Sequence, residues 1–261
     1  MSDVLQIRDL VVSYARRGGW RAQHVRAVDG VSLGVAAGEC VGLVGESGCG
    51  KSTLARAVVR LLPIDAGQVL LDGVDLAPLQ GSPLRDARRR LQMVFQDPYA
   101  SLDPRFTAAR IVAEPLAHFG IARGAAARAR ARELLALVGL DPAAHLDRYP
   151  HEFSGGQRQR LGLARALACE PRVLVCDEPV SALDVSIQAQ IVNLLVDLRQ
   201  RLGLALLFIS HDLAVVRKLA DRVAVMRAGQ IVEHGAVDGL FADPRHPYTR
   251  ELLAAVPTLP R

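Results

Sequence analysis

The chain has 261 residues, of which half are hydrophobic and 4% aromatic, and it carries a formal net charge of +5. This length supports one compact α/β unit with a substantial core. The arginines are spread out, so the charge does not indicate nucleic acid binding and suits an anionic membrane face equally well. We also expect no secretory signal and no span, because the apolar runs are far shorter than the ~20 residues that cross a bilayer.

Apolar runs bounded by glycines predict strands over 5–14, 30–35, 39–44, 68–72, 92–96, 172–176, 204–210, 222–226 and 230–234. Helical periodicity predicts helices over 52–62, 125–138, 155–169 and 186–202. Strands that alternate with helices indicate a largely parallel sheet covered on its faces. The early strands, joined by short glycine turns, resemble an antiparallel meander, and the polar segment 16–26 is predicted to be a mobile loop.

The block from residue 97 to 168 differs in character, because it has helical patterning, little strand signal and prolines at its turns. We interpret it as a helical lobe inserted into the α/β core. Four arginines among alanines over 123–132 invite a nucleic-acid interpretation. We favour a solvated helix face there and predict no nucleic-acid partner.

Residues 45–52 fit the phosphate-binding pattern GxxxxGK[ST] between a predicted strand and a predicted helix. The glycines allow several backbone N–H groups to face phosphates, and the helix N-terminus adds a favourable dipole. Lys51 is predicted to neutralise the β- and γ-phosphates of ATP, and the Ser52 hydroxyl to ligate Mg²⁺. The predicted ATP-binding residues here are Gly45, Glu46, Ser47, Gly48, Cys49, Gly50, Lys51, Ser52 and Thr53.

The four cysteines are Cys40, Cys49, Cys169 and Cys176, and their spacing matches no disulfide or zinc framework. We expect reduced thiols. Cys49 lies near a helix N-terminus, which favours a lowered thiol pKa. We therefore predict that thiol reagents inactivate the protein and that ATP protects it.

Paired acids end a strand further along the chain. Asp177 closes an apolar strand, from which its carboxylate reaches the Mg²⁺ shell on a rigid support. Glu178 follows at the strand tip and is predicted to orient and polarise the attacking water. The pair is weak evidence alone, but it is strong in combination with the phosphate loop.

Between these two halves lies Ser154, followed by Gly155, Gly156 and Gln157. Serine is a good N-cap, and the glycine pair lets a helix N-terminus approach an anion closely. The chain already has a loop for its own phosphates. A second anion-binding helix end is best used on ATP held by a partner subunit, in a dimer that closes around two nucleotides.

With these motifs in this order, the chain resembles the nucleotide-binding subunit of an ATP-binding-cassette (ABC) transporter over nearly its whole length. The resemblance implies that residues 153–157 are the signature, Gln96 is the Q-loop glutamine and His211 is the switch histidine that contacts the γ-phosphate. Gln96 would also join the Mg²⁺ shell. The D-loop would be formed by Ser181, Ala182, Leu183 and Asp184.

By the same resemblance Tyr14 is the aromatic residue that stacks on adenine, with Trp20 as its competitor. Each assignment has a simpler alternative when taken singly. In these alternatives, Gln96 merely ends a strand, His211 caps the following helix, and Tyr14 is a core residue. All of them together at the family's spacing favour the nucleotide site.

The resemblance implies an α/β P-loop NTPase core with a mainly parallel sheet, an N-terminal antiparallel β subdomain and an inserted helical subdomain. The core would comprise 1–96 and 169–240, the helical signature subdomain 97–168, and a short C-terminal extension 241–261. The alternative for the extension is an amphipathic terminal helix that carries no substrate information.

Residues 95–105 and 243–253 resemble segments of oligopeptide, dipeptide and nickel importers. The function implied is ATP hydrolysis that powers import of di- or oligopeptides. The alternatives are a nickel or other small-solute importer, a soluble ABC ATPase not coupled to transport, or a scaffold without turnover. We expect no iron–sulfur cluster, because no cysteine follows Cys176.

The implied partners are a second ABC ATPase subunit, identical or homologous, and two transmembrane permease subunits. An extracytoplasmic solute-binding protein would act indirectly. The implied location is the cytoplasmic face of a bacterial membrane, as a peripheral subunit.

Overall fold

A computed structural model describes residues 3–16 and 23–255. The chain forms two compact units. The first joins Met1–Leu79 to Ala205–Arg261, and the second is the intervening segment Gln80–Leu204. In the described part of the chain, no helix is both long enough and apolar enough to cross a bilayer.

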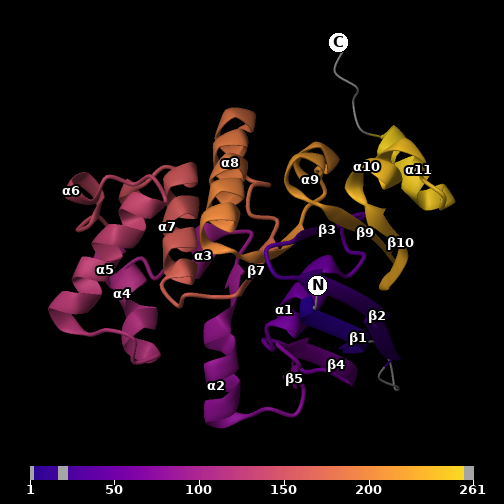
Figure 1. The fold of residues 1–261 in the computed structure, drawn as a ribbon, viewed down its shortest axis with the longest axis horizontal. Coiled ribbons are helices and arrows are strands. Elements are labelled where there is room, and N and C mark those ends of the chain that lie inside the picture. The colour runs from indigo at the N-terminus through magenta and orange to yellow at the C-terminus, as the bar shows by residue number, and fades with distance from the viewer. Residues whose placement is uncertain (1–2, 17–22, 256–261) are drawn as a thin grey trace. The chain divides into compact units, whose positions relative to one another are not determined.

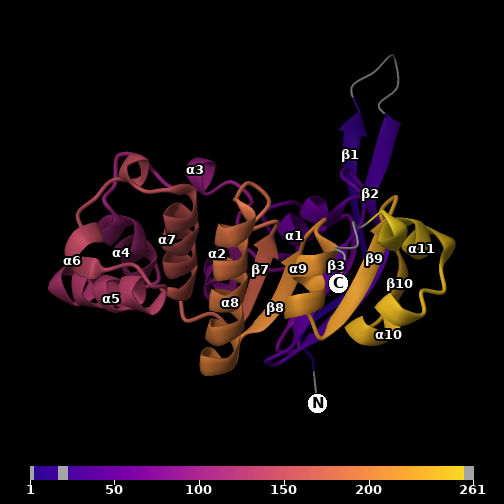
Figure 2. The same ribbon diagram turned by 90° about the horizontal axis from the view of Figure 1, so that it is seen from above.

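One sheet of the first unit is antiparallel, as predicted. Its strands are β1 (Asp3–Arg16), β2 (Gln23–Ala36), β4 (Ala66–Leu71) and β5 (Val74–Asp75), in the order β2-β1-β4-β5. The β1–β2 hairpin is drawn as two long adjacent strands in Figure 2. The prediction of a loop over 16–26 was wrong at residue 16 and over 23–26, because these residues pair in the β1–β2 ladder, and residues 17–22 lie outside the described residues.

The first unit also contains the strands β10 (Gln230–Ala236), β9 (Arg222–Arg227), β3 (Cys40–Val44) and β8 (Ala205–Ile209) in this order. Strand β3 is parallel to both β8 and β9, whereas β10 is antiparallel to β9. Every residue of β3 and β8 is buried, which explains their continuous apolar sequence.

Four helices accompany these strands: α1 (Lys51–Val58), α9 (Leu213–Leu219), α10 (Val237–Ala242) and α11 (Pro247–Ala254). Helix α9 lies close on β3, where a Cβ on Gly42 would collide with Val216. Helix α1 ends earlier than predicted, because Arg60 adopts a left-handed φ of 59°. Figure 1 shows α10 and α11 in yellow beside β10.

The second unit has two parallel strands, β6 (Leu91–Val94) and β7 (Val173–Asp177). Its longer helices are α2 (Gly81–Arg90), α4 (Ala108–His118), α5 (Gly124–Leu137), α7 (Gly155–Leu167) and α8 (Val185–Leu202). Short turns of helix occur at α3 (Pro98–Ser101), α6 (Pro142–His145) and η1 (Pro150–Glu152). Helices α4, α5 and α7 pack against one another, as Figure 1 also shows.

Two segments test the predicted helical lobe. The arginines of α5 form surface ion pairs, Arg128 with Asp147 and Arg130 with Glu133, so the solvated-face interpretation is confirmed. Helix α2 was not predicted, because none of its residues is buried and its sequence therefore lacks an apolar period. The mixed α/β architecture with an antiparallel N-terminal sheet is otherwise as predicted.

Candidate functional site

The phosphate-binding loop follows β3 and turns through three glycines with positive φ, Gly45 (154°), Gly48 (81°) and Gly50 (112°). A Cβ on Gly45 would collide with the carbonyl oxygen of Met226, and one on Gly50 with that of Ala27. Both positions therefore require glycine for space as well as for backbone conformation. Around Gly48 a Cβ would meet nothing within 4 Å, so the loop tip is open.

Lys51 begins α1 and is only 4% exposed. Its Nζ donates to the carbonyl oxygens of Gly45 at 2.8 Å and Glu46 at 2.9 Å. A buried ammonium is costly unless hydrogen bonds replace its water. The loop carbonyls supply these bonds, so the cation is held inside the curve of the loop.

His211 follows β8 at the same edge of the sheet at which the phosphate-binding loop follows β3. Strands β3 and β8 are parallel neighbours, with Leu43 opposite Ile209, and the Ser210 N–H donates to the Leu43 carbonyl at 3.2 Å. The side chain of His211 is exposed. It is not the cap of α9, because Asp212 occupies that position and accepts from the N–H groups of Ala214 and Val215.

Tyr14 lies near the end of β1 and borders the same helix as Lys51. Its hydroxyl is 3.2 Å from the Thr53 hydroxyl, and 44% of the residue is exposed. The core alternative for Tyr14 is therefore wrong. Its competitor Trp20 lies outside the described residues.

The second unit brings Gln96 to Glu178. Strands β6 and β7 are parallel with Val94 opposite Cys176, so both residues follow the same sheet edge, and Gln96 Nε2 donates to Glu178 Oε2 at 3.3 Å. Asp177 is 1% exposed at the end of β7. Glu178 has a left-handed φ of 46°, a conformation that costs about 1–3 kcal/mol in a non-glycine residue and is concentrated at functional sites.

A tight turn follows Glu178. The hydroxyl and the N–H of Ser181 both donate to the Glu178 carbonyl, at 3.1 Å and 3.3 Å. The turn continues through Ala182 and Leu183 to Asp184, the residue before α8. These bonds hold the backbone of Glu178 in its left-handed conformation, and they thereby fix the position from which its side chain extends.

The predicted signature forms the N-terminus of α7. Ser154 Oγ accepts from the Gln157 N–H at 3.3 Å, and Gln157 Oε1 accepts from the Ser154 N–H at 2.9 Å, which is a complete capping box. A Cβ on Gly156 would collide with Ile187 of α8, and one on Gly155 would lie 3.1 Å from Leu183. The glycine pair therefore also sets how closely α7 approaches the turn and helix after Glu178, a role that the sequence did not predict.

A model of the ABC transporter family matches residues 28–181. The chain belongs to this family. Two relatives are a probable peptide ABC transporter ATP-binding protein of Sinorhizobium fredii, 54% identical, and a putative peptide import ATP-binding protein of Brucella ovis, 53% identical. Each alignment covers 98% of this chain, with 74% of the first relative and 79% of the second.

The glutathione import ATP-binding protein GsiA of Pectobacterium atrosepticum is 51% identical over 97% of this chain, which spans 41% of that protein. Among solved structures, the ATP-binding cassette MJ0796 superposes with a TM-score of 0.78 at 30% identity. The match covers 89% of this chain and 98% of MJ0796, which was solved as a dimer in a post-hydrolysis state bound to ADP and Pi. The ABC ATPase fold and ATP binding predicted from the sequence are confirmed.

The residues of this ABC ATPase fit the nucleotide that the family binds. The open loop tip at Gly48 leaves room above backbone N–H groups, and the Lys51 ammonium is already inside the loop. Mg²⁺ prefers oxygen ligands, and the Ser52 hydroxyl and the Asp177 carboxylate are oxygen donors at the start of α1 and the end of β7.

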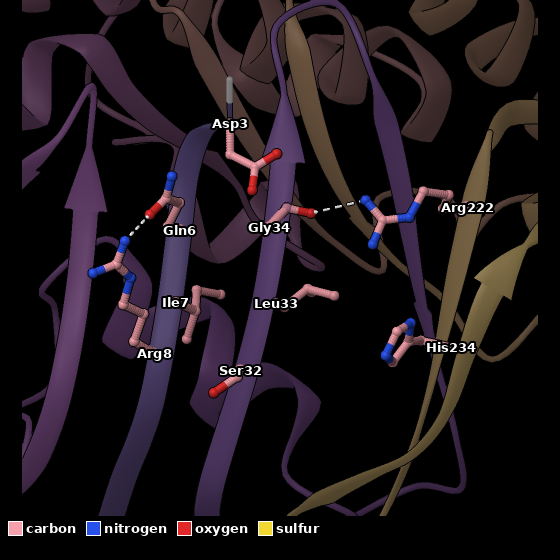
Figure 3. A pocket seen from close by; sticks show the side chains of 9 residues that line it. All are labelled: Asp3, Gln6, Ile7, Arg8, Ser32, Leu33, Gly34, Arg222 and His234. Atoms are coloured by element: carbon pink, nitrogen blue, oxygen red, sulfur yellow. Dashed lines mark hydrogen bonds between the residues drawn. The ribbon is translucent and has the colours of Figure 1, made fainter. Parts of the chain in front are cut away.

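A small cavity of about 260 Å³ lies elsewhere in the first unit (Figure 3). Its polar groups include Arg8, which donates to Gln6 at 2.6 Å, and Arg222, which donates to the Gly34 carbonyl and to Glu39. None of the site residues predicted from the sequence lines this cavity. It is therefore separate from the nucleotide-binding loop of the ABC ATPase.

Replacing Gly156 by alanine is expected to destabilise the protein by about 1–3 kcal/mol, because the new Cβ overlaps Ile187 in a packed contact. Urea unfolding measures the change. Gly162→Ala is the matched control on the same helix, since a Cβ there meets nothing within 4 Å. It should stabilise by about 0.5–1 kcal/mol through helix propensity. Equal effects of the two variants would contradict the close contact.

The prediction of a lowered pKa at Cys49 is wrong. Cys49 is buried, and burial raises the pKa of its thiol. The neighbouring Lys51 ammonium lowers this pKa, but it offsets the effect of burial only in part. The helix N-terminus is not strong enough to reverse this effect of desolvation. All four cysteines are buried and reduced.

Because the thiolate is the reactive species, Cys49 is expected to alkylate slowly at neutral pH, with a rate that increases as the pH approaches and passes its raised pKa. ATP is still expected to protect the residue. Cys169 and Cys176 are internal controls, because burial raises the pKa of each to about 12, so they should react later than Cys49. Peptide mass spectrometry after iodoacetamide treatment measures the order. Fast, pH-independent labelling of Cys49 would contradict the raised pKa.

Proposed function

We propose that this ABC ATPase is the nucleotide-binding subunit that powers import of di- or oligopeptides. The observation that carries the ATPase mechanism is Glu178, held at a strand end in a left-handed conformation with its carboxylate hydrogen-bonded to Gln96. A binding protein without turnover has no need of a carboxylate fixed in this way.

The chain's own ATP is assigned to the loop of residues 45–53. Its backbone N–H groups surround the phosphates, and Lys51 neutralises the charge that develops on them. Tyr14 stacks on adenine from the end of β1, next to Thr53. Mg²⁺ would be held by Ser52, Asp177 and Gln96, and would supply charge neutralisation between the β- and γ-phosphates.

Hydrolysis is assigned to three side chains. Glu178 orients and polarises the water that attacks the γ-phosphorus, and Gln96 fixes the direction of that carboxylate. His211 contacts the γ-phosphate from the edge where the phosphate loop also begins. Each of these groups lies on a short segment that follows a strand of the parallel sheet.

A second copy of an ABC ATPase subunit completes each site. Ser154, Gly155, Gly156 and Gln157 act on ATP held by the partner, while Ser181, Ala182, Leu183 and Asp184 form the D-loop. The dimer in which MJ0796 was solved supports this arrangement. ATP would favour the closed dimer, and hydrolysis would release it.

The proposed domain boundaries are a core of 1–96 and 169–240, a helical signature subdomain of 97–168 and an extension of 241–261. Two transmembrane permease subunits would dock on the helical subdomain near residues 97–105, and a solute-binding protein would deliver cargo to them. The chain would therefore work as a peripheral subunit on the cytoplasmic face of the bacterial membrane.

The names of relatives that are more than 50% identical support peptides as the cargo. The residues of an ATPase subunit do not contact the solute, so cargo is inferred from these relatives and not from geometry. Nickel import and a soluble ABC ATPase are the alternatives, and the peptide and glutathione names of the relatives do not favour either.

Uptake into proteoliposomes tests the proposal. The chain is purified together with its permease subunits and reconstituted, and uptake of labelled dipeptide, oligopeptide, glutathione and ⁶³Ni²⁺ is measured with ATP on the ATPase side. We expect peptide uptake that requires ATP. Uptake of nickel alone, or ATP hydrolysis without any associated permease, would replace this function by one of the two alternatives.

A further inference from the structure

The C-terminal segment 237–254 is anchored to the nucleotide-binding unit through Glu233 of β10. The Glu233 carboxylate accepts from the N–H groups of Arg245 at 2.8 Å and His246 at 3.0 Å. Burial acts to raise the pKa of Glu233, but the nearby Thr249 hydroxyl and the N–H groups of Arg245 and His246 outweigh it and lower the pKa. The carboxylate therefore stays ionised and fixes the start of α11.

Helix α11 begins in a defined place. Pro247 occupies its first turn, and His246 is its N-cap, whose Nδ1 accepts from the Tyr248 N–H at 3.2 Å. Tyr248 follows with 1% of its surface exposed, and the Arg227 guanidinium lies over its ring, 4.7 Å from the centroid. Burial also raises the pKa of Tyr248, so its hydroxyl is a neutral phenol.

The hydroxyl of Tyr248 accepts a hydrogen bond from the Glu46 N–H at 2.9 Å. This N–H belongs to the same peptide group as the Gly45 carbonyl, which accepts from Lys51 Nζ at 2.8 Å. A trans peptide is planar, and its N–H and C=O point in opposite directions. The peptide between Gly45 and Glu46 is therefore held from both sides, by Tyr248 on one and by Lys51 on the other.

The same peptide has few other supports for its orientation. Gly45 has a φ of 154°, which only glycine adopts readily. Because glycine has no Cβ, its own backbone torsions restrain the following peptide only weakly. The Met226 carbonyl lies close behind Gly45, which limits how far the peptide can move toward β9 but not how it rotates. The two hydrogen bonds, from Lys51 to its C=O and from its N–H to Tyr248, are the contacts that oppose its rotation.

We propose that Tyr248 is a positioning residue for the nucleotide site, whose hydroxyl holds the Gly45–Glu46 peptide in the orientation that keeps Lys51 in place for the phosphates. The C-terminal segment thereby tunes the affinity for ATP. This inference rests on the proposed function, because it assigns Lys51 to the phosphates. Under this proposal the segment 237–254 supports ATP binding, whichever solute is transported.

The test uses the full chain and its Tyr248→Phe variant, which keeps the ring and removes only the hydroxyl. ATP affinity, KM and kcat are measured, together with amide hydrogen exchange at Glu46. We expect Kd and KM for ATP to rise about 5- to 30-fold, since a partly buried N–H loses its partner. The kcat at saturating ATP should stay within about twofold. Exchange at Glu46 should become faster.

Thr249→Val is the matched control, because it removes a hydroxyl from the next buried residue of the same helix. It should leave the KM for ATP and the exchange at Glu46 unchanged. An equal rise in KM for both variants would overturn the proposal, since anchoring of the helix and not the Tyr248 hydroxyl would then matter. An unchanged KM and unchanged Glu46 exchange in Tyr248→Phe would also overturn it.

A measurement on the wild type alone covers the case in which Tyr248→Phe fails to fold. Coupling between sites is reciprocal, so ATP should slow amide exchange in α11 as well as in the loop. Slowing confined to the loop would overturn the proposal. Failure of peptide uptake with normal ATP binding would refute only the proposed cargo, because each of these readouts is independent of transport.

Discussion

The Glu178→Gln variant is expected to bind ATP and to lose hydrolysis by a factor of about 10²–10⁴, the range that positioned acid–base groups contribute. Glutamine keeps the shape and still accepts the hydrogen bond that Gln96 donates, so the local geometry is retained. It lacks the negative charge that polarises water. A phosphate-release assay at saturating ATP measures turnover, and ATP affinity is measured separately.

The matched control is Glu133→Gln, which makes the same chemical change on the exposed face of α5, where Glu133 pairs with Arg130. That ion pair is a surface contact worth little, so turnover should match the wild type. Because hydrolysis would release the closed dimer, Glu178→Gln should also accumulate as an ATP-bound dimer in size-exclusion chromatography. Turnover by Glu178→Gln close to that of the wild type would remove Glu178 from the mechanism.

Replacing Lys51 by methionine is expected to weaken ATP binding on the order of 10²–10³-fold. Methionine fills similar space but donates nothing, so the phosphates lose a charge-assisted partner and the carbonyls of Gly45 and Glu46 lose theirs. Isothermal titration with ATP and Mg²⁺ measures the loss of affinity. Hydrolysis at ATP concentrations that saturate the wild type should fall with it.

The chain contains one other lysine, Lys218, which is exposed on α9. Lys218→Met therefore removes the same charge from the net balance without touching the loop, and it should bind ATP as the wild type does. A similar loss of affinity in both variants would mean that net charge, and not the position of Lys51, attracts the nucleotide.

Local patterns were enough to predict the glycine-rich loop on which the proposed nucleotide site is built. Gly45, Gly50 and Lys51 lie between a buried strand and a helix, and their backbone conformation follows from their residue types and immediate neighbours. Helix α2 was missed because its stability does not depend on an apolar face. The strand β2 was predicted too short, because residues 23–29 pair with β1 through a ladder that no local pattern specifies.

Simpler alternatives for single residues were resolved by packing. Asp212, not His211, caps α9, and the exposure of Tyr14 excludes a core role. The direction of the pKa shift at Cys49 was predicted wrongly because the helix dipole is visible in the sequence, whereas burial of the thiol is not. Desolvation depends on every segment that surrounds a group, and these segments come from distant parts of the chain.

The sequence by itself therefore determined the chemistry of this ABC ATPase. The phosphate loop, the acid pair and the signature are short motifs, and their order and spacing along the chain indicate the chemistry without knowledge of the fold. The tertiary structure decided what supports them. Tyr248 reaches Glu46 across 202 positions of the chain, and Gly156 is required because Ile187 of another helix lies against it. Such contacts depend on how separate elements pack, and packing is a property of the whole fold and not of any one segment.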